Sequence, residues 1–168
     1  SSATVYGEPD SVPISEDAPT RPTNPYGHSK LMMEAMMRWV SVAHGIRYVS
    51  LRYFNVAGAL ADGSIGEDHS PESHLIPLVL QVPLGQRPYI TIFGDDYATP
   101  DGTCIRDYIA VTDLVDAHVK ALDYLQRGGD DLICNLGNGQ GFSVREIVDC
   151  ARKVTGHAIP VVMGQRRA

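Results

Sequence analysis

The chain has 168 residues, of which 43% are hydrophobic, so it can bury a core of single-domain size. It carries 20 acidic and 14 basic residues, and the basic ones form no cluster, which argues against a nucleic-acid-binding surface. No apolar run approaches the roughly 18–20 residues that cross a bilayer, and no secretory signal pattern is present, so we expect a cytoplasmic protein without a membrane partner.

The first residues, 1–6, are β-prone and predict the end of a strand whose beginning is missing, which suggests a fragment of a longer protein. Residues 8–23 are rich in Pro, Asp, Glu, Ser and Thr and predict a polar loop with several turns. A loop of this length is often functional.

A helix should follow the loop. Thr23 or Asn24 can cap it, Pro25 suits its first turn, and Gly45 should end it. Apolar residues lie on more than one of its faces, so we expect it to be covered on several sides. Four of the five methionines occur here and suit either adaptable core packing or a contact between subunits.

The remaining elements alternate between strands and helices, which predicts a parallel α/β sheet. They are a strand over 46–53, a turn over 54–59, a loop over 61–73, a helix over 74–84, a strand over 89–93, a helix from the cap Thr112 to 126, a strand over 132–136, a helix with a capping box of Ser143 and Glu146, and a final strand over 158–163.

Tyr26 and Lys30 are four residues apart near the start of the predicted helix, so both side chains project from one face. A neighbouring ammonium favours the phenolate form of a tyrosine, which makes the pair a candidate for proton transfer. The same spacing occurs by chance in many helices, so the pair alone is a weak signal.

Two other patterns are weaker. Glycines at 137, 139 and 141 lie between a predicted strand and helix, but their spacing does not fit a dinucleotide-binding loop, and we interpret them as a structural turn. His69 and His74 lie beside Asp68 and Glu72, yet nothing in the expected chemistry requires a metal, so we expect none.

Seven segments occur in an order that is more specific than any one of them: SSATVYG at 1–7, NPYGHSK at 24–30, LRYFNVAGA at 51–59, HLIP at 74–77, IFGDDY at 92–97, DGTCIRDYI at 101–109 and NLGNG at 135–139. Together they resemble the extended short-chain dehydrogenase/reductase family over essentially the whole chain. The branch they look like is that of the UDP-glucose 4-epimerases. Sister dehydratases carry Asp-Glu where Ala3-Thr4 stands here.

The resemblance implies an α/β fold made of the second half of a Rossmann-type parallel sheet and a smaller α/β substrate-binding lobe. It assigns residues 1–57 to the NAD-binding Rossmann domain and 58–168 to the nucleotide-sugar-binding lobe, and it allows the strand near 132–136 to return to the Rossmann sheet. In this family a helix like that over 29–43 pairs subunits, so a homodimer is expected.

The implied reaction interconverts UDP-glucose and UDP-galactose through a transient 4-keto intermediate with tightly bound NAD, as part of galactose metabolism. Tyr26 would take the proton from the sugar 4-hydroxyl, Ser2 would hydrogen-bond the 4-oxygen, and Lys30 would assist Tyr26 and bind the nicotinamide ribose. Phe54 would lie beside the nicotinamide.

The resemblance also implies a set of substrate contacts. Asn55 would hydrogen-bond the nucleotide-sugar, and Arg106 and Arg167 would clamp the diphosphate, a task that suits a planar, always-charged donor. The full set is Ser2, Tyr26, Asn55, His74, Leu75, Thr91, Phe93, Arg106 and Arg167. For Leu75 and Phe93, plain core packing is nearly as good an interpretation.

The glycine-rich fingerprint that would hold the adenosine half of NAD is absent from this sequence. We therefore expect the chain alone to be inactive. A nucleotide-sugar-binding module and a sister epimerase for UDP-N-acetylglucosamine or a UDP-uronic acid stay open as alternatives, because the sequence does not choose among these sugars.

Overall fold

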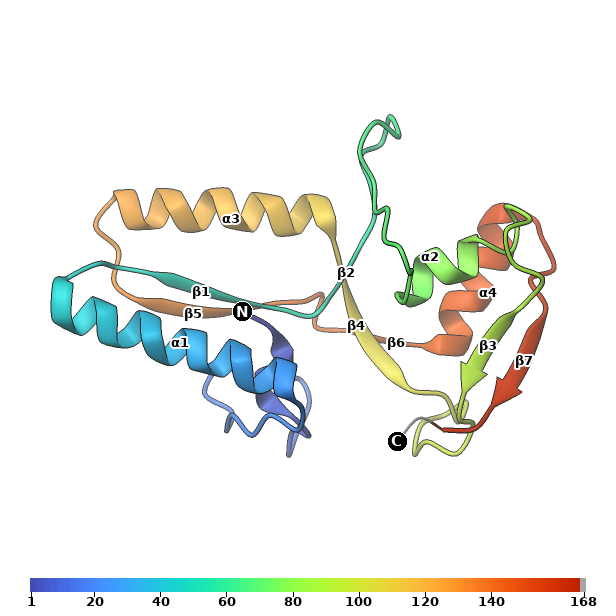
Figure 1. Ribbon diagram of the computed structural model, residues 1–168, viewed down its shortest axis with the longest axis horizontal. Coiled ribbons are helices and arrows are strands. Elements are labelled where there is room, and N and C mark those ends of the chain that lie inside the picture. The colour runs from blue at the N-terminus through green and yellow to red at the C-terminus, as the bar shows by residue number, and fades with distance from the viewer. Residues whose placement is uncertain (167–168) are drawn as a thin grey trace. The chain divides into compact units, whose positions relative to one another are not determined.

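The computed structural model describes residues 1–166 and divides the chain into two compact units (Figure 1). The first unit comprises residues 1–56 and 108–140, and the second comprises residues 57–107 and those from 141 on. Within the described residues, no helix is both long enough and apolar enough to cross a bilayer.

The first unit contains a parallel strand pair, β1 (Val49–Tyr53) and β5 (Leu132–Leu136), flanked by helix α1 (Pro25–His44) and helix α3 (Val111–Gln126) (Figure 1). The pair is in register from its first residues to its last. The expected mixed α/β class with parallel strands is thereby confirmed.

Alternation along β1 explains how one strand holds two helices. Successive side chains point to opposite faces of a strand. Arg52 reaches Glu34 of α1, while the hydroxyl of the next residue, Tyr53, contacts His118 of α3. The tyrosine and histidine rings also meet edge to face, with centroids 5.4 Å apart.

Helix α1 begins and ends where the sequence predicts. The side chain of its N-cap, Asn24, accepts the N–H of Gly27 at 2.8 Å, and Pro25 occupies the first helical position. Gly45 ends the helix at φ +66°, a left-handed conformation that glycine adopts without a Cβ penalty.

The coverage expected for α1 is not found among residues 1–166. Its only buried residues are Gly27 and Glu34. The exposed large apolar side chains on the helix are Met32, Met33, Met36, Trp39, Val40 and Val42.

The expectation of a strand end at residues 1–6 was largely wrong. Ser2 makes a single parallel bridge with Tyr53, but Ala3–Tyr6 is a 3₁₀ turn, η1, with Ser2 as its N-cap. Val5 and Tyr6 are buried, so their β propensity reflects burial rather than strand pairing.

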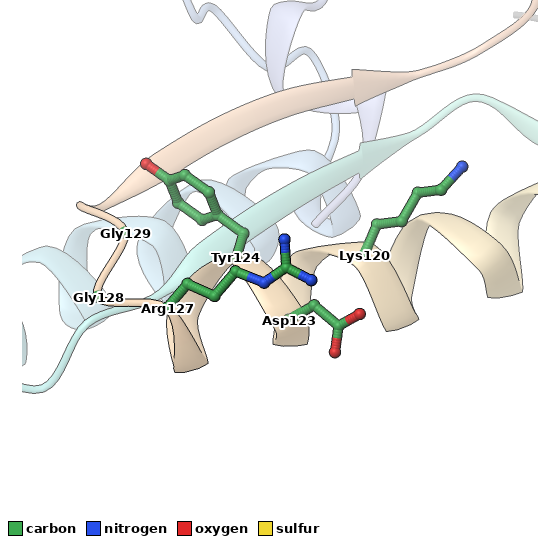
Figure 2. A pocket seen from close by; sticks show the side chains of 6 residues that line it. All are labelled: Lys120, Asp123, Tyr124, Arg127, Gly128 and Gly129. Atoms are coloured by element: carbon green, nitrogen blue, oxygen red, sulfur yellow. The ribbon is translucent and has the colours of Figure 1, made fainter.

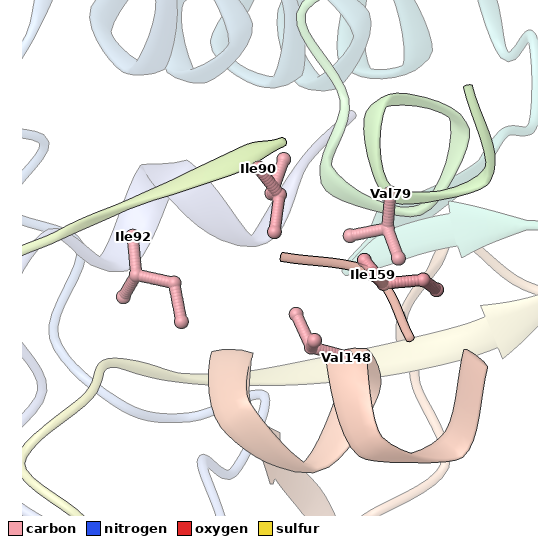
Figure 3. Packing of buried hydrophobic residues seen from close by; sticks show 5 residues of the cluster. All are labelled: Val79, Ile90, Ile92, Val148 and Ile159. Carbon is pink, nitrogen blue, oxygen red and sulfur yellow. The ribbon is translucent and has the colours of Figure 1, made fainter. Parts of the chain in front are cut away.

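The second unit is built on another parallel pair, β3 (Ile90–Phe93) and β7 (Val161–Gly164), with helices α2 (Leu75–Leu80) and α4 (Val144–Thr155). Five buried side chains from these elements and from the segment before β7 converge on one core (Figure 3), namely Val79, Ile90, Ile92, Val148 and Ile159. This core anchors α2 and β3, on which the candidates Leu75, Thr91 and Phe93 lie.

Three short strands escaped prediction: β2 (Asn55–Ala57), β4 (Ile105–Ala110) and β6 (Gly141–Ser143), which form a sheet of order β2-β4-β6. The turn expected over 54–59 was therefore wrong in part. In the antiparallel β4–β6 pair, Arg106 lies opposite Phe142. Pairing partners nearly 40 residues apart in sequence leave no local signal.

Several boundaries also differ from the sequence expectations. The strand expected over 46–53 begins at Val49, and the final strand begins at Val161 rather than at 158. Helix α2 ends at Leu80 rather than at 84, because a residue before a proline, here Pro83, avoids the helical region. Helix α3 has Ala110 as its N-cap, so Thr112 does not cap it.

Candidate functional site

A close backbone approach organises the site in the first unit. The first turn of α1 packs on η1, and a Cβ built on Gly27 would lie 2.7 Å from the carbonyl oxygen of Thr4 and 2.9 Å from Cβ of Pro22. Only glycine allows this approach. The close approach brings the start of α1, with Tyr26 and Lys30, near the turn that Ser2 caps.

Ser2 is held in place by its own turn and is 8% exposed. Its Oγ accepts the hydroxyl of Thr4 at 2.9 Å and the N–H of Thr4 at 3.3 Å. A serine hydroxyl has two lone pairs and one hydrogen. With both lone pairs engaged, the hydrogen is directed to a third group, which suits Ser2 for donating to a substrate oxygen.

Tyr26 and Lys30 share one face of α1, as their spacing predicts. The Lys30 Nζ lies 5.3 Å from the centroid of the Tyr26 ring, and the Tyr26 side chain is more than half exposed. The pair therefore combines an accessible phenol with an adjacent positive charge.

Phe54 and Asn55 follow β1 directly and are half-buried. The backbone N–H of Phe54 donates to the carbonyl of Leu136 at 3.0 Å, which extends the β1–β5 ladder by one bond and fixes where the chain leaves the sheet. The first unit thus contains Ser2, Tyr26, Lys30, Phe54 and Asn55.

A buried ion pair braces this arrangement. The Arg52 guanidinium donates to both carboxylate oxygens of Glu34, at 3.0 and 2.8 Å, and the two side chains are only 4% and 6% exposed. Ser1 donates to the same carboxylate at 2.5 Å, which ties the residue before Ser2 to α1. Sequence inspection missed this pair, whose members are 18 residues apart.

The environment of Glu34 favours its charged form. Burial alone would raise the pKa of this carboxyl, but hydrogen bonds from Arg52 and Ser1 outweigh burial, and the net pKa is below the ordinary value. Arg52 also donates to the hydroxyl of Tyr6 at 2.7 Å, and that hydroxyl donates to Asn135 of β5 at 2.7 Å. The pair thus belongs to a network that spans α1, β1 and β5.

In the second unit, Thr91 and Phe93 lie on the face of β3 opposite the core. Gly164 pairs with Phe93, and a Cβ built on Gly164 would lie 2.9 Å from Cγ2 of Thr91 and 3.1 Å from the Phe93 ring. The strand alternation therefore sends Ile90 and Ile92 into the core and leaves the two candidates together.

The other candidates of the second unit lie on separate elements. His74 is the N-cap of α2, and Leu75 is its first residue. Arg106 is exposed on β4, where its guanidinium donates to the carbonyl of Ile105 at 2.8 Å. Arg167 lies outside the described residues.

One residue near His74 was missed. The sequence offered Asp68 and Glu72 as acidic neighbours of the histidines, and Glu72 does contact His74, but the second carboxylate there is that of Glu67, with Oε1 2.6 Å from Nδ1 of His74. Side chains two residues apart in an extended segment point to the same side. The spacing of Glu67 and His69 could therefore have indicated that Glu67 lies near the histidines.

One hollow of the first unit lies apart from these residues. It measures about 430 Å³ at the end of α3 and is lined by Lys120, Asp123, Tyr124, Arg127, Gly128 and Gly129 (Figure 2). The hydroxyl of Tyr124 accepts the N–H of Asp130 at 3.1 Å, and a Cβ on Gly129 would lie 2.4 Å from the Tyr124 ring. We interpret the hollow as a by-product of this helix end, because none of the candidate residues lines it.

Comparison with known families gives one match that covers most of the chain. Residues 1–137 match the family described as "NAD dependent epimerase/dehydratase family". Among curated proteins, the chain is 58% identical over 168 residues to the UDP-glucose 4-epimerase of Halalkalibacterium halodurans, covering 100% of this chain and 50% of that protein.

Solved structures agree. A UDP-glucose 4-epimerase from Brucella ovis in complex with NAD matches with a TM-score of 0.96 and 51% identity, covering 100% of this chain and 52% of that one. One from Bifidobacterium longum in complex with NAD⁺ and UDP matches with a TM-score of 0.93 and 45% identity, covering 99% and 50%. The chain spans about half the length of the curated relatives it matches.

Proposed function

Because the chain belongs to the NAD dependent epimerase/dehydratase family, we propose that the protein containing it is a UDP-glucose 4-epimerase. It would interconvert UDP-glucose and UDP-galactose through a transient 4-keto sugar, as a step of galactose metabolism. The mixed α/β fold with parallel strands supports this proposal, since the solved structures that it resembles are UDP-glucose 4-epimerases.

The observation that carries the proposal is the packing of α1 on η1 at Gly27. A helix with a side chain at position 27 could not approach the Thr4 carbonyl so closely. This approach brings the Tyr26–Lys30 face close to the turn that Ser2 caps. An acid–base group must lie within hydrogen-bond distance of the proton that it transfers.

The chain's residues fit a nicotinamide cofactor in part. Lys30 has an ammonium suited to a ribose hydroxyl, and Phe54 has a ring suited to lie beside the nicotinamide. When bound, NAD would accept a hydride from C4 of the sugar and return it to the opposite face of C4. The residues for the adenosine half belong to a fingerprint that this sequence does not contain.

The proton follows a separate route through the side chains. Tyr26 takes the proton of the 4-hydroxyl as the C4–O bond becomes a carbonyl, and it gives the proton back when the ketone is reduced. Ser2 donates its hydrogen to the same oxygen, where negative charge develops. Lys30 stabilises the phenolate of Tyr26 by its charge.

Substrate binding would depend on several further side chains. Asn55 would hydrogen-bond the nucleotide-sugar, and Arg106, together with Arg167, would bind its diphosphate. The remaining contacts we propose are His74, Leu75, Thr91 and Phe93. The domain limits of 1–57 and 58–168 stay part of the same proposal.

A homodimer and a cytoplasmic location complete the proposal. The exposed apolar face of α1 supports pairing with a second copy, since a hollow of about 350 Å³ on it is lined by Met33, Met36, Met37, Val40, Ile46 and Tyr48. Imaging of a fluorescent fusion would check the location.

The test is turnover of UDP-galactose by the full-length protein and its Tyr26→Phe variant. Loss of the phenol should lower kcat by about 10²- to 10⁴-fold, the usual contribution of a positioned acid–base group. Tyr89→Phe is the matched control, because Tyr89 is also exposed and lies outside the candidate site. Full activity of Tyr26→Phe would refute the assigned role.

Three further assays separate the alternatives. We expect the 168-residue chain alone to be inactive, and turnover by it would contradict that expectation. UDP affinity without any turnover by the full-length protein would favour a binding module. Faster turnover of UDP-N-acetylglucosamine or of a UDP-uronic acid would favour a sister epimerase.

A further inference from the structure

The loop between β2 and α2 gathers four side chains that can donate electron pairs. Glu67, His69, Glu72 and His74 each contribute one ligand atom, and these four atoms lie within 4.8 Å of one another. All four residues belong to the second unit. No step of the proposed reaction uses this cluster as a group.

The closest distances within the cluster suit a single small ion. His69 Nδ1 and His74 Nδ1 are 3.3 Å apart, and Glu67 Oε1 lies 3.1 Å from the first and 2.6 Å from the second. Glu72 Oε1 lies 2.9 Å from His74 Nδ1. Ligand atoms around a tetrahedral zinc ion, with bonds of about 2.0–2.1 Å, are separated by about 3.3 Å.

Hydrogen atoms alone do not satisfy these groups. An ionised carboxylate only accepts, and a neutral imidazole carries one N–H in total. The Nδ1 of His74 nevertheless faces two carboxylate oxygens and a second imidazole nitrogen. One hydrogen cannot serve three partners, whereas a cation accepts electron pairs from several ligand atoms at once.

Part of the cluster is already fixed in position. Glu72 Oε1 accepts the backbone N–H groups of Ser73 and His74, both at 2.7 Å, and the Glu72 side chain is only 7% exposed. The rings of His69 and His74 stack with centroids 5.1 Å apart. Both histidines are more than half exposed, so an ion can reach them from solvent.

We propose that Glu67, His69, Glu72 and His74 bind a divalent transition metal of the zinc class, with both imidazoles coordinating through Nδ1. Imidazole ligands favour zinc and its neighbours over magnesium and calcium, which take oxygen ligands. Two carboxylates neutralise the dication. The site differs from the pattern weighed in the sequence, because Glu67 replaces Asp68 as a ligand.

The test is metal titration of the chelator-treated full-length protein. Added Co²⁺ should bind one ion per chain and give the visible absorption of a four-coordinate site, and Zn²⁺ should displace it. His69→Ala and Glu67→Gln should each weaken Zn²⁺ binding roughly tenfold or more, since each removes a ligand. Mg²⁺ should compete poorly.

The control variant is His157→Ala, which removes another exposed histidine, one whose Nδ1 contacts the backbone carbonyl of Thr155 at 2.8 Å. Its Zn²⁺ affinity should equal that of the unaltered protein. Circular dichroism of each variant checks that it is folded. The proposal is overturned if folded protein binds no Zn²⁺, if His69→Ala binds as tightly as His157→Ala, or if Mg²⁺ binds equally well.

Discussion

At the residue scale, Gly27 determines how near α1 comes to the turn capped by Ser2. Gly27→Ala should gain up to about 1 kcal/mol in helix propensity but lose about 1–3 kcal/mol to overpacking against Thr4 and Pro22. A displacement of about 1 Å at Tyr26 can cost about 100-fold in rate. We therefore expect a large fall in kcat, measured by steady-state kinetics. The free energy of unfolding, measured by thermal unfolding, should fall only slightly.

The matched control for this change is Gly66→Ala. A Cβ at Gly66 would meet only Cβ of Ala59, at an ordinary 3.5 Å. Kinetics of this variant should match those of the unaltered protein. Equal activity of Gly27→Ala and Gly66→Ala would show that the close approach is not needed for catalysis.

The Glu34–Arg52 pair gives a second prediction at this scale. Removing one partner of a buried pair leaves an uncompensated charge, so Arg52→Met should destabilise the protein by about 3–5 kcal/mol. Replacing both residues by apolar ones should cost less than Arg52→Met alone. Lys120→Met, which breaks the exposed pair with Asp116, should leave the free energy of unfolding nearly unchanged.

The same pair makes stability depend on pH. The folded-state pKa of Glu34 is below its ordinary value of 4.5, so its contribution is complete above that pH and is lost as pH falls through the lower, folded-state pKa. Denaturant unfolding between pH 7 and pH 3 should show this loss. The Glu34→Gln variant should be less stable than the unaltered protein at pH 7, and its free energy of unfolding should change less with pH in the acid range. An unchanged pH dependence in that range would contradict the assignment.

Individual residues were only partly predictable. The spacing of Tyr26 and Lys30 gave their shared face, because helix geometry is local. The roles of Gly27 and Arg52 could not be foreseen, since each depends on what another segment places against it, the Thr4 carbonyl in one case and Glu34 in the other.

At the element scale, the capping box of α4 shows how a short motif fixes a boundary. Ser143 Oγ accepts the N–H of Glu146 at 3.0 Å, and the Glu146 carboxylate accepts the N–H of Ser143 at 2.7 Å. Ser143→Ala should cost about 0.5–2 kcal/mol in unfolding free energy. Glu146→Gln, which keeps the motif, should cost much less, and equal losses would argue against the box.

Side-chain caps and glycine stops explain which elements were predicted well. Helix α1 carries both signals and was placed closely, and the capping box placed the start of α4. Helix α3 begins at Val111, and its N-cap, Ala110, makes no side-chain cap, so Thr112 misled the prediction. Strands β2, β4 and β6 pair with distant segments, and their sequences alone do not indicate such pairing.

At the scale of the whole molecule, the exposed apolar face of α1 is the surface through which we propose that two copies pair. Single exposed apolar residues are ordinary, but a contiguous group of large ones marks an interaction surface. Met36→Lys on this face should convert a full-length dimer into a monomer, measured by light scattering. A monomeric unaltered protein would contradict the proposed pairing.

Val119→Lys is the corresponding control. Val119 is an exposed apolar residue on helix α3, outside the face of α1. This variant should keep the mass of the unaltered protein. If both variants dissociate, the loss reflects general charge repulsion rather than the α1 surface.

The methionines on that surface have a chemical consequence as well. The thioethers of Met32, Met33 and Met36 are each at least 52% exposed in the isolated chain. Peroxide converts a thioether into a polar sulfoxide, which reductases can reverse. A single protomer would expose these methionines to oxidants, whereas the proposed dimer would shield them. Oxidative damage would therefore fall first on molecules without a partner.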